Sequence, residues 1–153
     1  MAGETDGRRR AFYTSDDEHD KAVDLLLSAF DAFDDMVYIV DVDLRLVLFN
    51  EPFKTVAGAF GVNAEQMLGR PLTDFADQAR ELAEGVIPEL KHTLSTGDRI
   101  VKRRCVDLGE QQIWLESTKV PMRRDGRIAQ ILVIARDITR LYHTEAALDE
   151  SES

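Results

Sequence analysis

The spacing of apolar residues changes along the chain and predicts its order of elements. Val23, Leu26 and Leu27 belong to a run of apolar positions three or four residues apart, which predicts an amphipathic helix over residues 16–35. Residues 1–15 are polar and show no such period, so we expect a flexible leader there. The predicted helix has an apolar face that needs a surface to cover.

A β-hairpin is expected directly after this helix. Two runs rich in β-branched and aromatic residues, 36–42 and 45–50, are separated by a turn that contains Asp41 and Asp43. Proline and several glycines then predict a series of short helices. The apolar stripe over 73–95 predicts one longer helix, in which a proline introduces a kink or a restart.

The apolar period falls to two in the last third of the chain, which predicts strands over 99–108, 111–122 and 127–138. The last strand is apolar at both parities, so both faces of its sheet must be covered. A helix over 139–153 is expected to leave the core. We therefore predict an α+β core over 36–138, with a five-stranded antiparallel sheet, short helices on one face and the N-terminal amphipathic helix on the other.

Composition limits the cellular setting and the partners. The chain has 153 residues, of which 44% are hydrophobic, and this suits one domain. Its formal net charge of -10 argues against a nucleic-acid partner, because phosphate binding needs a basic surface. The one cysteine excludes an intramolecular disulfide and fits a reducing cytoplasm. No run approaches the ~20 apolar residues that span a bilayer, so we expect no membrane contact in this segment.

No pattern of residues predicts catalysis. The sequence lacks a glycine-rich phosphate loop, a nucleophile elbow and a specific metal-binding spacing of histidines. Glu18, His19 and Asp20 form a polar cluster that a solvated helix face explains, and Asp41 and Asp43 are turn formers. We predict a non-catalytic domain without a metal site.

Several motifs over 28–150 resemble the PAS domain family. The predicted hairpin ends in Asn50, a residue commonly found there in the family. Residues 66–71 resemble the segment between the family's short helices, and 124–126 resemble its last turn. The most specific match is Asp-Ile-Thr at 137–139, where the last strand of a PAS domain passes into a signalling helix.

The resemblance implies a ligand cavity between the inner face of the sheet and the helices. The candidate residues are almost all apolar, and each is either a ligand contact or plain core: Ile39, Phe49, Phe53, Val56, Met67, Leu72, Phe75, Leu82, Cys105, Leu115, Ile131 and Val133.

The resemblance also places a signalling junction at Asn50, Asp137, Ile138 and Thr139. Asp137 can accept hydrogen bonds from backbone N–H groups or pair with an arginine, and Thr139 can cap the following helix. A joint with two such arrangements can pass a shift of the sheet to the helix, whereas the simpler alternative is an ordinary helix cap. Arg140 replaces the family's usual acidic residue at the next position, so the salt bridge of that position is not carried over.

The residues narrow the ligand without naming it. Flavin photochemistry of the LOV class needs a cysteine where this chain has Pro71, so we expect it to be absent. Haem needs a histidine from the long helix, but His92 falls opposite the apolar stripe. Cys105 is expected to be a small buried hydrophobe, and Trp114 either stacks on a ligand or packs on the outer sheet face. A non-covalent flavin and a small aromatic or carboxylate metabolite stay open.

The expected function is that of an intracellular sensor domain. It would pass a ligand-dependent signal through its last helix to a C-terminal effector, such as a histidine kinase or a transcriptional regulator. A homodimer would form through the N-terminal helix and the outer face of the sheet. Two alternatives stay open, a dimerisation scaffold that senses nothing and a small enzyme on a cone-shaped α+β fold.

Overall fold

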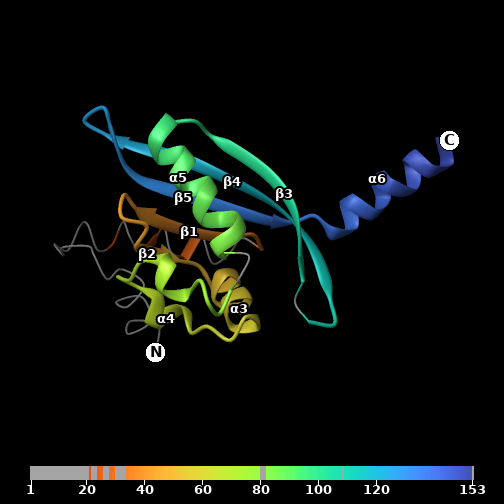
Figure 1. Cartoon of the computed structure of the whole chain (residues 1–153), viewed down its shortest axis with the longest axis horizontal. Coiled ribbons are helices and arrows are strands. Elements are labelled where there is room, and N and C mark those ends of the chain that lie inside the picture. The colour runs from red at the N-terminus through yellow and green to blue at the C-terminus, as the bar shows by residue number, and fades with distance from the viewer. Residues whose placement is uncertain are drawn as a thin grey trace.

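The computed structural model describes residues 21, 24–25, 28–29, 34–79, 82–107 and 109–152. Within these residues the chain forms one curved sheet, with helices over one face and a last helix that extends away from it (Figure 1). The predicted leader, and most of the predicted helix over 16–35, lie outside the described residues.

The sheet has five strands, and every neighbouring pair is antiparallel. Their order across the sheet is β2-β1-β5-β4-β3, so the last strand lies at the centre. This confirms the predicted α+β fold with a five-stranded antiparallel sheet. The strands are β1 (Met36–Asp41), β2 (Leu46–Phe49), β3 (Ile100–Asp107), β4 (Gln112–Arg124) and β5 (Arg127–Asp137).

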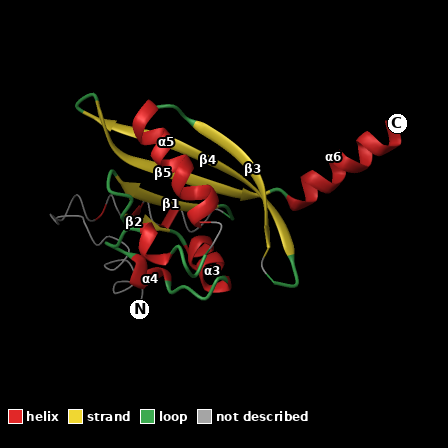
Figure 2. Ribbon diagram, viewed as in Figure 1, coloured by secondary structure: helices red, strands yellow, loops and turns green. Residues whose placement is uncertain are grey.

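The helices follow the strands in two groups. Between β2 and β3 the chain forms α3 (Glu51–Ala59), α4 (Ala64–Met67), the 3-10 turn η1 (Leu72–Phe75), the π-helical turn η2 (Leu82–Val86) and α5 (Ile87–Thr96). After β5 it forms α6 (Thr139–Glu152). Figure 2 shows the first group on one face of the sheet, with α5 lying across β4 and β5.

The helical stretch predicted over 73–95 is not one continuous helix. η1 is a separate turn, whereas η2 passes directly into α5, and the restart predicted at the proline agrees with the beginning of α5. Pro88 lies in the first turn of α5, where its missing N–H costs nothing, whereas in the middle of a continuous helix it would remove a hydrogen bond. Gly97, with a φ of 74°, ends α5 in the left-handed conformation that glycine adopts without strain.

Side chains alternate between two apolar clusters on opposite faces of the sheet. The larger cluster joins the inner face to the helices, with Phe49, Leu72 and Ile131 among its most buried members. A smaller cluster contains Ile39, Val47 and Leu48, which lie on the outer face. Because successive strand residues point to opposite faces, β1 contributes to both clusters. This pattern agrees with the expectation that both faces are covered.

The first and last strands of the core meet at one end of the sheet. Met36, the first residue of β1, pairs with Ala135 near the end of β5. Asn50 fixes this end, since its side chain accepts hydrogen bonds from the N–H groups of Val37 and Phe53 and donates one to the carbonyl of Asp35. It therefore caps α3 and ties it to the beginning of β1.

Candidate functional site

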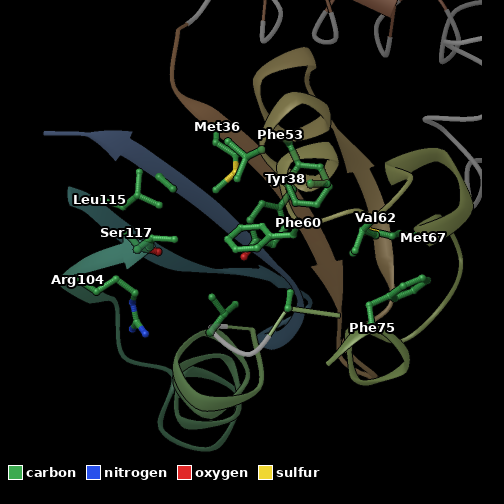
Figure 3. Close-up of a pocket in the computed structure, with 16 residues that line it drawn as sticks. Met36, Tyr38, Phe53, Phe60, Val62, Met67, Phe75, Arg104, Leu115 and Ser117 are labelled. Carbon is green, nitrogen blue, oxygen red and sulfur yellow. The ribbon is translucent and has the colours of Figure 1, made fainter. Parts of the chain in front are cut away.

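A cavity of about 110 Å³ lies between the inner face of the sheet and the helices. Every strand except β2 contributes to its wall, and Figure 3 shows Leu115, Ser117 and Arg104 on the side opposite Val62, Met67 and Phe75. The wall is almost wholly apolar. The residues that line it are Met36, Tyr38, Phe53, Val56, Ala57, Phe60, Val62, Met67, Phe75, Ala79, Val86, Arg104, Val106, Leu115, Ser117 and Ala135.

Strand alternation explains which residues reach the cavity. On β3, Arg104 and Val106 line it, and on β4, Leu115 and Ser117 do. Each pair is two residues apart, as expected for positions that share one face of a strand. Across the cavity the ring of Phe53 packs against Tyr38, with ring centroids 4.8 Å apart. The aromatic side of the wall is therefore formed by rings that pack against one another.

A cluster of buried charges lies beside the cavity and is defined by Glu89 on α5, Arg104 on β3 and Lys119 on β4. Glu89 Oε1 accepts from Lys119 Nζ at 2.6 Å, and Glu89 Oε2 accepts from Arg104 Nη2. Lys119 Nζ also contacts Ser117 Oγ at 2.5 Å. The exposed fractions of the Lys119, Glu89 and Arg104 side chains are 0%, 14% and 23%. We call these three residues the charge cluster.

The main chain of η2 makes room for this cluster. A Cβ atom on Gly85 would overlap Nη1 of Arg104, so any larger residue would displace the guanidinium from its place. Burial lowers the pKa of Lys119, while the carboxylate of Glu89 opposes that effect by favouring the charged amine. The cluster thus depends on Glu89 to hold two cations in a region of low polarity.

Tyr38 carries a second buried polar group into the cavity. Burial raises the pKa of its phenol above the ordinary value of 10.0, and the negative charge of Glu89 adds to this while Arg104 opposes it. The folded chain therefore keeps a proton that the unfolded chain loses at about pH 10. Stability from this group is complete below that pH and falls as the pH rises further.

A titration of phenol absorbance tests this assignment. The chain has three tyrosines, and one of them should stay protonated well above pH 10 until the protein unfolds. Tyr38→Phe should remove this late step. An unchanged late step in that variant would contradict the assignment.

Only some of the predicted cavity residues line the cavity. Phe53, Val56, Met67, Phe75 and Leu115 do so. The inner core cluster holds four others, which pack behind the wall: Phe49, Leu72, Ile131 and Val133.

Two predicted cavity residues lie elsewhere. Ile39 belongs to the outer cluster, because its neighbours Tyr38 and Val40 take the inward positions of β1. Cys105 is exposed rather than buried, because Arg104 and Val106 take the inward positions of β3. The side chain of Leu82 lies outside what the structure describes.

The polar residues of the wall were missing from the sequence prediction. Tyr38, Arg104 and Ser117 all line the cavity. Each of them lies two residues from an apolar residue that faces the cavity from the same strand. This spacing could have predicted that they face inward. A charged residue at an inward strand position indicates a buried ion pair or a ligand contact.

The two positions at which haem or LOV-type flavin chemistry would need a specific residue, His92 and Pro71, do not line the cavity. His92 is exposed on α5, as expected from its place opposite the apolar stripe. Pro71 bridges to Arg45 beside β2. Within the described ranges, no three His, Cys, Asp or Glu side chains are placed to hold a metal ion. No helix in the same ranges is long and apolar enough to cross a membrane.

The predicted junction residues connect β5 to α6 through β4. Asp137 Oδ1 accepts from the backbone N–H of Thr139 at 2.9 Å and from its hydroxyl at 2.6 Å. The Thr139 hydroxyl oxygen accepts from the N–H of Trp114 at 2.9 Å, and the N–H of Ile138 donates to the carbonyl of Trp114 at 2.8 Å. Thr139 is thus the first residue of α6, where we had expected a residue that caps this helix, and it also links α6 to β4. Asn50 lies at the same end of the sheet, between β2 and α3.

Side chains extend this link along α6. The ring of Trp114 stacks on Tyr142, with centroids 3.8 Å apart and planes at 18°. Arg103 bridges Glu116 on β4 and Glu145 on α6, at 3.0 and 3.1 Å. Trp114 faces away from the cavity, so of its two expected roles the structure favours packing on the outer face. The first two turns of α6 are therefore held in a defined orientation on the sheet.

The sheet, the helices over its inner face and the apolar cavity between them define an α+β domain with a pocket and an outgoing helix. A family model described as PAS fold matches residues 30–143. The chain therefore belongs to the PAS fold family.

Solved structures agree with this fold. A PAS domain from Colwellia psychrerythraea is 21% identical, with a TM-score of 0.56, and the match covers 78% of this chain and 98% of that one. A sensory box sensor histidine kinase from Vibrio cholerae is 19% identical, with a TM-score of 0.55 and coverage of 80% and 95%. An RNA-binding light-oxygen-voltage receptor is 21% identical, with a TM-score of 0.62 and coverage of 84% and 37%. At these identities the likeness shows the fold alone. No curated protein matches the chain.

Proposed function

We propose that this PAS domain binds a small, largely apolar ligand in its cavity and relays the binding event through β4 and β5 to α6. The observation that carries the proposal is the position of Leu115. Its side chain lines the cavity. The adjacent residue in the chain, Trp114, forms one hydrogen bond with Ile138 and one with Thr139, and its ring stacks on Tyr142. A displacement of β4 at the cavity wall therefore reaches the start of α6 within one residue.

The volume of the cavity limits the size of the ligand. A dry cavity of ~150 Å³ lined by Leu, Ile and Phe binds benzene in another protein. At about 110 Å³, the cavity here suits a ligand of one ring or a short chain. A three-ring flavin or a haem would require the helices to move away from the sheet. We therefore favour the small aromatic or carboxylate metabolite over the non-covalent flavin.

The proposal extends to the setting of the domain. We infer that α6 continues the signal to a C-terminal effector, a histidine kinase or a regulator, and that the PAS domain itself is non-catalytic. One of the similar structures is named as a sensory box sensor histidine kinase, which supports a kinase as one candidate for the effector. A cytoplasmic homodimer that uses the N-terminal helix and the outer sheet face completes the proposal, and the acidic, cysteine-poor composition is compatible with it.

Filling the cavity should abolish binding of a one-ring probe. In the wild-type chain, toluene should raise the melting temperature and change the emission of Trp114, the one tryptophan, because that ring is stacked at the junction. Ala135→Leu places three further carbons at the wall and should remove both effects. Differential scanning fluorimetry and tryptophan emission measure them.

Ala147→Leu, an exposed change on α6, is the matched control and should leave both toluene effects intact. The proposal would be wrong if toluene neither stabilised the wild-type chain nor altered its emission.

A further inference from the structure

We infer that the ligand of this cavity carries an anionic group, a carboxylate or its equivalent, that pairs with Arg104 at the β3 side of the wall. This inference rests on the proposed function and specifies the chemical class of its ligand. Three observations on the charge cluster and the wall carry it.

The charge cluster has more positive than negative charge. Among the described residues, Arg104 and Lys119 form ion pairs with one and the same carboxylate, that of Glu89. Lys119 is fully buried and the other two side chains are mostly buried, so water screens the excess cation poorly. The neighbouring Ser117 hydroxyl adds no charge. One monovalent anion in the cavity would balance the cluster.

A donor of Arg104 also lacks a partner. Its Nε atom is buried and makes no hydrogen bond within the part of the chain that the structure describes. A buried donor without an acceptor costs free energy that a bound acceptor would recover. A carboxylate suits this position, because the planar guanidinium donates parallel N–H groups that match two carboxylate oxygens.

The rest of the wall indicates the chemistry of the part of the ligand that does not contact Arg104. Phe53, Phe60 and Phe75 line the cavity away from Arg104, on the helical side (Figure 3). They offer only apolar and aromatic contact, which favours a ring or a short hydrocarbon chain. The two halves together describe a small aromatic or aliphatic monocarboxylate.

Two probes of nearly equal size and different charge test the inference on the whole chain. Benzoate carries a carboxylate on one ring, and benzyl alcohol replaces it with a neutral polar group. Because a hydrogen bond to a charged group is stronger than one to a neutral group, benzoate should bind at least ~10-fold more tightly in isothermal titration calorimetry. Benzyl alcohol with equal or higher affinity would overturn the inference.

Variants then locate the preference at one residue. Arg104→Gln should reduce the preference for benzoate to about 2-fold or less, because it removes the charge that the carboxylate meets. Arg124→Gln removes the same charge from an exposed position at the end of β4 and should retain the preference. Retention in Arg104→Gln would also overturn the inference. If that variant does not fold, the comparison of the two probes on the wild-type chain decides alone.

Toluene separates this inference from the proposed function. Binding of toluene and benzyl alcohol without a preference for benzoate would end the inference and leave the cavity as a site for neutral apolar ligands. Failure of all three probes to bind would end the proposed function, and the inference with it.

Discussion

Replacing Glu89 with glutamine should lower the free energy of unfolding by about 3 kcal/mol, because it leaves the fully buried Lys119 and the partly buried Arg104 without a countercharge. The side-chain shape is kept, so the loss reports the charge rather than packing. Lys119 can avoid being an unpaired buried charge only by losing its proton, and burial already lowers its pKa. Urea denaturation followed by circular dichroism measures the change.

The loss of unfolding free energy in Glu89→Gln should also depend on pH. Lys119 has a lower pKa in the folded chain than in the unfolded chain, so between these two values the unfolded chain binds more protons. Stability then rises as the pH increases toward the ordinary lysine value of 10.5. The loss in Glu89→Gln should therefore be larger near neutral pH than in alkaline solution.

Glu65→Gln is the control for this prediction. Glu65 pairs with Lys54 at 3.2 Å at the surface, where 44% of the lysine side chain is exposed. Such a surface pair is worth less than about 1 kcal/mol. A loss in Glu89→Gln no greater than that in Glu65→Gln would show that the charge cluster does not depend on its carboxylate.

Thr139→Val should disconnect α6 from the sheet without emptying the cavity. Valine keeps the shape of threonine but loses the hydroxyl that donates to Asp137 and accepts from the N–H of Trp114. We expect the free energy of unfolding to fall by about 1–2 kcal/mol. Hydrogen exchange of the Trp114 amide should become at least ~10-fold faster. Toluene should still bind, but its effect on Trp114 emission should be lost. Hydrogen exchange by NMR and fluorescence measure the two results.

Thr144→Val is the matched control, because the Thr144 hydroxyl donates only to the carbonyl of Arg140 within α6. It should keep the toluene-dependent emission change and the slow exchange at Trp114. A Thr139→Val chain that behaves like this control would show that the hydroxyl link does not transmit the change. The relay would then have to use the stacked ring or the ion pairs of Arg103.

The strands of the sheet could be predicted because the alternation of apolar and polar residues in a strand is a local property of the sequence. The two-residue period after Gly97 predicted three strands, and the last of them, which is apolar at both parities, lies at the centre of the sheet. The helical segment before it was harder to predict, because an apolar stripe persists through turns that interrupt the helix. Only Pro88 marked where α5 begins.

The polar part of the site depends on contacts far apart in the sequence. Glu89, Arg104 and Lys119 come from three elements, and no local pattern brings a helix carboxylate to two strand cations. Parity alone could place Arg104 inward beside Val106, and the same reasoning would have turned Cys105 outward. Pairing across the sheet, which fixes Trp114 beside Ile138, becomes visible only in three dimensions.

The pairing of Met36 with Ala135 brings the beginning and the end of the core together. Polypeptide on either side of such a core can be joined, lengthened or replaced with little disturbance to the interior, as in domains that tolerate insertion into a host chain. The domain is thus suited to insertion between two segments of another protein, because the two ends of its core lie side by side.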